Sequence, residues 1–481
     1  MLAPSHLPSP SPAGSDGAKP ARSARVAAAG GSPPRSGRIS RLRASEAANN
    51  FAWLALDRGL RLLTGVFVGS WVARYLGQGD FGLLSYALAF VGIFAALAPL
   101  GLEPIAVREI IRTPGEGGRW IGTVVGFRAG AAVLFAALAG ALIVALRPHD
   151  LRAWGVVAIL SAGLLLQSLE SGELWFQAHA RMRRLVVPRL TLMLLMNALK
   201  VIAILRGAGL MWFALFTALE QALGGGLTWW LVRRSLGPEN RPAFEVRRGG
   251  RMLRECWPLA VSALAVVLYM KLSQILVGQM LGDAALAIYA AAIRLPEAAL
   301  FVPVILSSSL LPSLLRSRAQ GAEPYRAARL RFFRLNTLLG FAICLPLSLG
   351  APWIIRLLFG DSYRDAAAVM SVYTWSLLFV FMGVARAQHL LNERNTHLPL
   401  WYSLLGLGVN LAGCLMLIPR WGAMGAAIAT VFSQLASAFL SSFLHPGTRE
   451  VGREQWRALI SPWRIRGETS LPLPPAAAML P

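Results

Sequence analysis

Long apolar segments recur along most of the chain, and they constrain what it can fold into more than any other feature. A helix of about 20 mostly apolar residues crosses a bilayer core of roughly 30 Å. Twelve such segments lie near residues 52–73, 81–102, 120–146, 153–176, 185–205, 211–232, 256–281, 290–315, 333–358, 368–391, 398–418 and 421–444. Prolines interrupt the ninth. The sequence therefore predicts an all-α, polytopic membrane protein with about twelve transmembrane helices.

The composition agrees with this interpretation. The chain has 481 residues, of which 56% are hydrophobic and only 15% are charged, whereas soluble domains have about 25% charged residues. The net charge of +24 does not indicate nucleic-acid binding, because the cations lie in short connections between apolar segments. Cysteines and histidines form no metal-ligand pattern, and no P-loop, GxGxxG or GxSxG motif is present. We therefore expect no metal, no cofactor and no catalytic residues.

The distribution of positive charge predicts the orientation in the membrane. Most Lys and Arg residues outside the segments fall in the two terminal stretches and in the even-numbered connections. The positive-inside rule then places both termini in the cytoplasm. Residues 1–48 are rich in Pro, Ser, Gly and Arg, which predicts a disordered basic tail without a cleaved signal peptide. Residues 445–481 are expected to form a second cytoplasmic tail.

A weak internal repeat divides the chain into halves. ARYLGQGDFGLLSYALA follows the first segment and GQMLGDAALAIYAAA follows the seventh, with the Leu-Gly pairs at 76–77 and 281–282 aligned. Six helices per half would give both halves the same orientation, which is the parallel-repeat plan of transporters. We therefore predict six-helix bundles at 49–235 and 256–444, joined by a basic linker at 236–255. The alternative is that any helical hairpin with such a turn would look alike.

Several charged residues lie within the apolar segments. A lysine inside a span costs roughly 2.5–3.5 kcal/mol, so it should face protein or water rather than lipid. Lys200 and Arg386 lie close enough to segment ends to snorkel. The cations in the early helices of each half are Arg58, Arg61, Arg128, Lys271 and Arg294, and the charges that could pair with them or gate access are Asp57, Glu103, Arg108 and Glu297.

We predict that the five cations line one water-filled cleft that attracts a phosphate or pyrophosphate. Charges are poorly screened where water is scarce, and the planar guanidinium suits phosphate. Two other interpretations remain open. Lys271 could be a packed structural charge, and Asp57, Glu103 and Glu170 could form an ion-pair lattice with the arginines. One-to-one pairing with acids, or side chains that point into acyl chains, would argue against the cleft.

Five stretches carry a family resemblance, in the same order along the chain. They are ARYLGQGDFGLLSYA at 73–87, LGLEPIAVREI at 100–110, YMKLSQILVGQMLGDAALAIYAAAIRLPE at 269–297, LLFGDSYRDAAAVMSVYTWSLLFVFMGVA at 357–385 and LGVNLAGCLMLIPRWGAMGAAIATVFSQ at 407–434. The chain resembles the polysaccharide biosynthesis (oligosaccharide flippase, Wzx-like) family of the multidrug and oligosaccharidyl-lipid exporter superfamily.

This resemblance implies two bundles that rock to give alternating access. The implied substrate is an undecaprenyl-pyrophosphate-linked oligosaccharide, moved across the bacterial inner membrane for surface polysaccharide synthesis. Membrane lipids, a polysaccharide polymerase and glycosyltransferases are the implied partners. Arg128 falls where relatives often carry an arginine, and Lys271 matches the lysine of a KLDQ-type motif. Ser273 replaces the Asp of that motif, which removes a partner for Lys271 and argues against cation coupling.

Two rival functions follow from the same residues. One is a cation-coupled multidrug antiporter of the same superfamily, which would need a carboxylate-rich cavity to bind organic cations. The other is a scaffold that recruits glycosyltransferases without transport. Cations exceed acids within the segments, so we favour the flippase.

Overall fold

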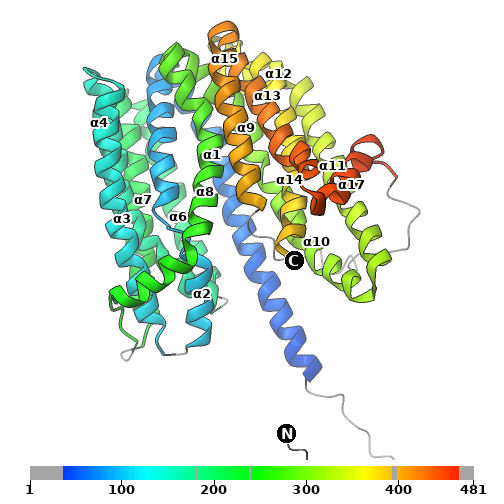
Figure 1. Ribbon diagram of the computed structural model, residues 1–481. Helices are drawn as coiled ribbons and strands as arrows, with labels where there is room; N and C mark the ends of the chain where they lie inside the picture. Colours follow the sequence, from blue (N-terminus) through cyan, green and yellow to red (C-terminus); the bar gives the residue numbers. More distant parts are fainter. Residues whose placement is uncertain (1–35, 114, 180, 238–239, 393–397, 465–481) are drawn as a thin grey trace, which may run out of the picture. The chain divides into compact units, whose positions relative to one another are not determined.

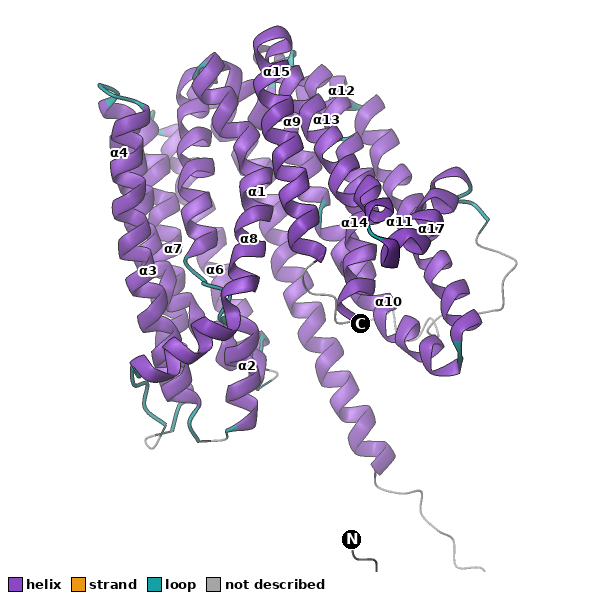
Figure 2. Ribbon diagram, in the orientation of Figure 1, coloured by secondary structure: helices purple, strands orange, loops and turns teal. Residues whose placement is uncertain are grey.

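The computed structural model describes residues 36–113, 115–179, 181–237, 240–392 and 398–464. Within these ranges the secondary structure is helical, with no strand (Figure 2). The chain forms two compact units, residues 1–46 and 47–481. Of the first unit only residues 36–46 are described, as the beginning of α1. All other helices belong to the second unit.

The described residues form α-helices and four short helical elements. The α-helices are α1 (Ser36–Leu97), α2 (Glu103–Arg112), α3 (Gly117–Leu146), α4 (Leu151–Gln167), α5 (Glu173–Ala178), α6 (Arg183–Leu205), α7 (Leu210–Ser235), α8 (Val246–Leu281), α9 (Asp283–Ala299), α10 (Phe301–Gln320), α11 (Ala322–Leu349), α12 (Ala351–Phe359), α13 (Ala366–Tyr373), α14 (Trp375–Asn392), α15 (Leu398–Gln434), α16 (Ser441–Leu444) and α17 (Arg449–Ile460). The short elements are η1 (Ser168–Gly172), η2 (Asp361–Tyr363), the π-helical η3 (Leu435–Leu440) and η4 (Pro446–Thr448).

Ten stretches of the described residues are long and apolar enough to cross a membrane. Two of them, Leu56–Leu97 and Leu398–Leu444, contain 42 and 47 residues, about twice the roughly 20 that one crossing needs. Each bends at a glycine with positive φ, 72° at Gly77 and 57° at Gly422, a conformation that disfavours other residues. The ten stretches overlap all twelve predicted segments, and the prediction of an all-α polytopic membrane protein is confirmed.

The ninth predicted segment, 333–358, is wrong as a single helix. α11 ends at Leu349, and a separate short helix, α12, occupies Ala351–Phe359. Pro346 has no N–H to donate in the last turn of α11, and Pro352 lies in the first turn of α12, where proline favours a helix start. The break therefore follows from the two prolines.

Much of the predicted linker at 236–255 is a folded part of α8. Its first turns pack on α3, where a Cβ on Gly249 would overlap the ring of Phe127. Arg248 donates a hydrogen bond to Glu116 across the same contact at 2.8 Å. This stretch therefore fastens the start of α8 to the first six predicted helices.

The predicted tails are only partly described. Residues 1–35 and 465–481 lie outside the described residues, whereas 36–48 begin α1 and 446–460 form η4 and α17. Figure 1 shows α2, α3, α4, α6 and α7 toward the left of the view and α10 to α14 and α17 toward the right, with the upper part of α8 between them. One apolar core nevertheless includes residues from both predicted bundles. The division into two repeated bundles stays a prediction.

A buried ion pair holds α17 against the beginning of α11. Arg329 donates to Glu454 from Nε and Nη2 at 2.6 and 2.7 Å, and the two side chains are only 6% and 9% exposed. Nearby, Gln455 Nε2 donates to the backbone carbonyl of Ala438 in η3 at 3.2 Å. Buried polar contacts therefore fix the position of α17.

We expect Arg329→Ala to destabilise the protein by about 3–5 kcal/mol, because it leaves the Glu454 carboxylate buried without its cation. The thermal unfolding midpoint of the purified protein measures this effect. Arg326→Ala on the same helix removes an arginine that is 54% exposed and should cost at most about 1 kcal/mol. Equal shifts for both variants would mean that burial of the pair does not hold α17 in place.

Candidate functional site

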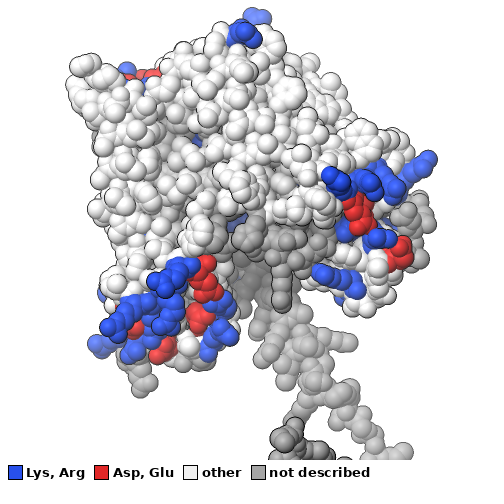
Figure 3. Space-filling view, in the orientation of Figure 1, with Lys and Arg blue, Asp and Glu red and all other residues white. Residues whose placement is uncertain are grey.

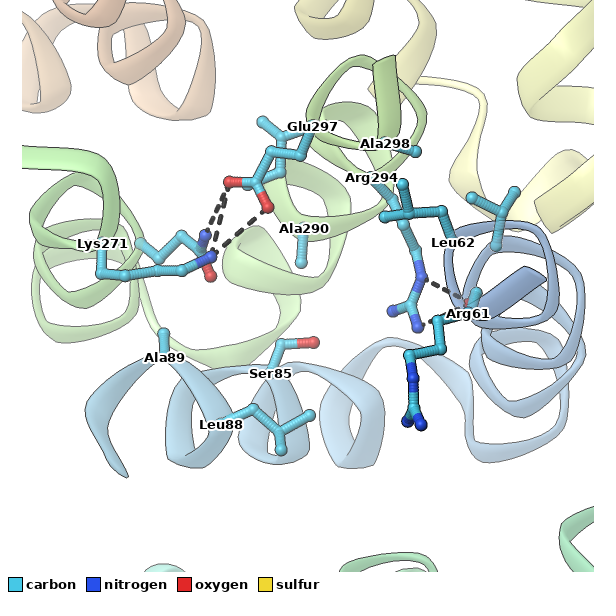
Figure 4. Close-up of a pocket in the computed structure, with 14 residues that line it drawn as sticks. Arg61, Leu62, Ser85, Leu88, Ala89, Lys271, Ala290, Arg294, Glu297 and Ala298 are labelled. Carbon is cyan, nitrogen blue, oxygen red and sulfur yellow. Dashed lines mark hydrogen bonds and ion pairs between the residues drawn. The ribbon is translucent and has the colours of Figure 1, made fainter. Parts of the chain in front are cut away.

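A cavity of about 350 Å³ lies between α1, α8 and α9. Both arms of α1, the residues before and after the bend at Gly77, contribute to its lining. Four charged side chains line it: Arg61 from α1, Lys271 from α8, and Arg294 and Glu297 from α9 (Figure 4). Ser85 adds a hydroxyl, and most other lining residues are apolar. Because α1 opens the first predicted bundle and α8 and α9 open the second, the cavity lies where the two predicted bundles meet.

Two of the three lining cations are paired with an acid. Lys271 Nζ lies 3.3 Å from a Glu297 carboxylate oxygen, and Arg61 Nε lies 3.1 Å from Asp57. Figure 4 shows Lys271 and Glu297 pointing toward one another. Asp57 does not line the cavity. Lys271 and Arg61 are therefore each paired with one carboxylate, as expected if they are packed structural charges.

Arg294 has a different kind of partner. Its Nε and Nη2 donate to the backbone carbonyl of Gly65 at 3.1 and 2.9 Å. A Cβ on Gly69 would lie 2.0 Å from Nη2, so the guanidinium lies directly on the α1 backbone in space that only glycine leaves open. Among the described residues no carboxylate lies within 4.0 Å of this guanidinium. Arg294 therefore has no carboxylate in direct contact among the described residues, and Glu297 acts on it only from beyond that distance.

The charge balance of the cavity is positive. Three cations line it against the single carboxylate of Glu297, and one positive charge remains even when Asp57 is counted with Arg61. This excess of positive charge attracts an anion. The arrangement can therefore hold an anionic group between α1 and α9.

The structure does not bring Arg58 or Arg128 to this cavity. Arg58 is exposed. Arg128 on α3 is 8% exposed, and its Nη1 lies 3.3 Å from Glu103 at the start of α2. The five predicted cations therefore separate into three that line the cavity and two that lie elsewhere.

A cation that the sequence pattern did not reveal, Arg189 on α6, lies near Arg128. Arg189 is 13% exposed and binds Glu170 at 3.0 Å and Glu173 at 2.7 Å. Both glutamates also act electrostatically on Arg128. Of the acids in the alternative ion-pair lattice, Glu103 and Glu170 pair with arginines in this region, whereas Asp57 pairs with Arg61.

Arg108 pairs with a partner in α8 rather than with the predicted set. Its Nη1 and Nη2 donate to the two oxygens of Glu255 at 2.9 and 3.2 Å. These hydrogen bonds hold the pKa of the Glu255 carboxyl below its usual value. Both side chains are exposed, so the contact links α2 to α8 at the surface.

The snorkelling expectation is wrong for Arg386. Its side chain is buried, donates to the hydroxyl of Ser441 at 2.6 Å and lies 4.2 Å from the ring centroid of Tyr402. These partners satisfy the charge without water. Lys200 is paired with Glu220 at 2.9 Å, mostly buried and away from the cavity.

Ser273 does not face Lys271. Its hydroxyl lies 3.1 Å from Asn410 Oδ1 and 3.2 Å from Thr430 Oγ1, both on α15. None of these three buried side chains is charged. Across the described residues, no group of three or more His, Cys, Asp or Glu side chains could hold a metal ion.

A second set of contacts joins the predicted bundles at the turn between α8 and α9. Arg147, at the end of α3, donates to both oxygens of Asp283 at 2.7 and 3.1 Å and lies 4.0 Å from the ring centroid of Tyr86. A Cβ on Gly82 would lie 1.8 Å from the carbonyl oxygen of Asp283, so the two backbones touch. Gln279 also donates to the Tyr86 hydroxyl at 2.6 Å.

Contacts between α1 and the α12–η2 region reinforce this connection. The Tyr363 hydroxyl donates to the carbonyl of Ala73 at 2.9 Å, and Arg74 donates to the carbonyl of Arg356 at 3.1 Å. Tyr363 is buried in the core that both predicted bundles share. Side chains and backbone therefore close the gap between the bundles near the bend of α1 at Gly77.

Solved membrane transporters share this fold. A structure described as the lipid II flippase MurJ in an inward closed conformation matches with a TM-score of 0.67 at 13% identity, covering 86% of this chain and 91% of that chain. An inward-facing multidrug resistance MATE family transporter of the MOP superfamily matches at 0.63 and 16% identity, covering 83% and 95%. A MOP superfamily transporter from Pyrococcus furiosus matches at 0.54 and 14% identity, covering 86% and 97%. At these identities the likeness shows the fold alone.

No curated protein sequence matches the chain. The family model described as "Polysaccharide biosynthesis protein" matches residues 71–368, which is more than half of the chain. This match includes the part of α1 after Gly77 and the helices α8 and α9 that line the cavity, but it begins after Arg61 and the other lining residues of the first part of α1. The chain therefore belongs to the polysaccharide biosynthesis protein family.

Proposed function

We propose that this protein is a flippase that moves an undecaprenyl-pyrophosphate-linked oligosaccharide across the bacterial inner membrane. The substrate passes from the cytoplasmic to the outer leaflet for surface or extracellular polysaccharide synthesis, and both termini lie in the cytoplasm. The observation that carries the proposal is the cavity where three cations face one carboxylate. The family match and the flippase fold among its structural neighbours support it.

The pyrophosphate would bind by replacing the carboxylates that pair with the cavity cations, which are Glu297 in the lining and Asp57 outside it. Arg294 is held by a backbone carbonyl and keeps its charge for the substrate. Lys271 and Arg61 are each neutralised by one carboxylate, and a pyrophosphate carries more negative charge and more acceptor oxygens than one carboxylate. Charge-assisted bonds to phosphate are strong in such a site. No covalent bond is made or broken, so we assign no enzymatic activity.

The proposed transport cycle is alternating access, with bundles 49–235 and 256–444 rocking about the cavity. The contacts of Arg147 with Asp283 and of Gly82 with the Asp283 backbone would form the closed end in the observed conformation. The polyprenyl chain would stay in lipid between helices, while the sugar and pyrophosphate pass through the cavity.

A multidrug antiporter is the second candidate, because a MATE family transporter shares the fold at a similar TM-score. The cavity argues against it. An organic cation would need carboxylates in place of the three lining cations, and Glu297 is the only acid among the lining residues.

Reconstitution tests the proposal directly. Vesicles that contain the purified full chain and a fluorescent lipid-pyrophosphoryl oligosaccharide are treated with an impermeant reagent that quenches only the outer leaflet. We expect protein-dependent exposure of the inner-leaflet label. Uptake of an organic cation without lipid movement would favour the antiporter, and neither activity would favour the non-transporting scaffold.

Removal of the cavity lysine should impair flipping. We expect Lys271→Gln to lower the rate by about tenfold or more, which corresponds to at least about 1.4 kcal/mol of lost attraction. Lys200→Gln is the matched control, because Lys200 is also a mostly buried lysine paired with one glutamate but lies away from the cavity. Equal losses in both variants would mean that the lysine acts through stability alone.

Displacement of Arg294 should have a similar effect without removing a charge. In Gly69→Ala the new methyl group would overlap the guanidinium, so we expect the Arg294 side chain to move and flipping to fall severalfold. Gly59→Ala, in the same arm of α1, places its methyl group in open space and controls for the helix. Unchanged flipping by Gly69→Ala would contradict a role for the position of Arg294.

Disruption of the contact between Gly82 and the Asp283 backbone, at the proposed closed end, should expose the cavity. Gly82→Ala would press a methyl group against the Asp283 backbone, whereas Gly79→Ala meets nothing within 4 Å. We expect a cysteine at Ser85, in the cavity lining, to react faster with an impermeant maleimide from the outer side when Gly82→Ala is present. If Gly79→Ala accelerates the reaction equally, the Gly82 contact does not keep this end closed.

A further inference from the structure

The outer face of α17 combines arginines with large apolar side chains. The inner face of the helix contains the buried residues Val451, Glu454, Gln455 and Ala458. At 100° per residue, the residues of the opposite face fall within about 100° of one another. These exposed residues are Arg449, Arg453, Trp456, Arg457 and Ile460.

The acids and arginines of α17 are separated between the two faces. Glu450 and Glu454 bind Arg326 and Arg329 of α11 at 2.8 and 2.6 Å. On the outer face, neither Arg453 nor Arg457 has a carboxylate within 4.0 Å among the described residues. Figure 3 shows Lys and Arg gathered over this region of the surface. The outer face therefore carries positive charge that pairs with no acid in the part of the chain that the structure describes.

A small aromatic cavity adjoins these two arginines. Phe443, Arg453, Trp456 and Arg457 line a space of about 310 Å³. Trp456 packs on Phe439, with ring centroids 6.1 Å apart, and Phe439 packs edge-on against Phe443 at 5.6 Å. The aromatic rings form an apolar floor, and the side chains of Arg453 and Arg457 complete the lining.

The position of α17 along the chain places this surface near the edge of the membrane. The last membrane-crossing stretch ends at Leu444, and α17 begins five residues later at Arg449. Trp456 and Ile460 are 51% and 57% exposed. Exposed tryptophan and aliphatic residues beside arginines on an amphipathic helix are typical of helices that lie in the headgroup region of a bilayer.

We propose that Phe443, Arg453, Trp456 and Arg457 form a binding site for an anionic phospholipid of the leaflet beside α17. The lipid phosphate lies between the two guanidinium groups, and the glycerol and upper acyl chain lie on Trp456 and Phe443. A zwitterionic lipid gains less, because its own cation repels the uncompensated arginines. This site is separate from the transport cavity and uses none of its residues.

The test is lipid binding by the full chain, purified in detergent and followed by native mass spectrometry. We expect at least one phosphatidylglycerol molecule to bind more tightly than phosphatidylcholine. The double variant Arg453→Gln with Arg457→Gln should weaken that binding by about tenfold or more. Because both arginines are exposed and form no ion pair with a described residue, the thermal unfolding midpoint should not change, which separates lipid loss from misfolding.

A matched control removes the same charge elsewhere. Arg247 and Arg251 are exposed and four residues apart on α8, and their replacement by Gln should leave the tight phosphatidylglycerol binding intact. Equal binding of the two lipids by the unaltered protein would overturn the proposal, as would equal weakening by both double variants. Competition by glycerol phosphate as strong as that of the lipid would also overturn it, because the aromatic floor would then contribute nothing.

Discussion

A charge in an apolar environment must be neutralised or hydrogen-bonded, and this constraint shapes the interior of the protein. Lysines within the helices meet single glutamates, as in the contact of Lys271 with Glu297. Arg386 is satisfied by hydroxyls and an aromatic ring, and Arg294 by a backbone carbonyl. These kinds of partner differ in the net charge that remains on the pair. Carboxylate pairing removes the charge, whereas a carbonyl only orients the cation, so the site at Arg294 stays positive.

The helices could be predicted from the sequence because hydropathy is a local property. The third predicted segment, 120–146, and α3 at Gly117–Leu146 share their end. The contacts between helices could not be predicted, because they depend on how each helix is rotated about its axis. Arg128 illustrates this limit, since its place in the third segment is compatible with several directions, and the structure turns it toward Glu103. Arg61, Lys271 and Arg294 do meet as the cluster of cations suggested.

Two sequence patterns, one in α1 and one in α17, can be understood only from the structure. Gly69 in α1 leaves the space in which the guanidinium of Arg294 lies on the helix backbone, whereas a Cβ on Gly65, which supplies the carbonyl, would meet nothing within 4 Å. The residues of α17 look like a polar tail when read in order. Only their helical arrangement separates the acids, which bind α11, from the arginines and Trp456, which face outward.

In the proposed flippase, Glu297 and Asp57 affect the conformational change of the substrate-free protein as well as the binding of substrate. A carrier must change conformation without substrate to return, and three unpaired, partly buried cations would make that step costly. Glu297 and Asp57 neutralise two of them in the observed state. The same acids compete with a pyrophosphate for Lys271 and Arg61, so they lower the affinity for substrate. Arg294, which no carboxylate neutralises, then supplies the attraction that the two ion pairs cannot.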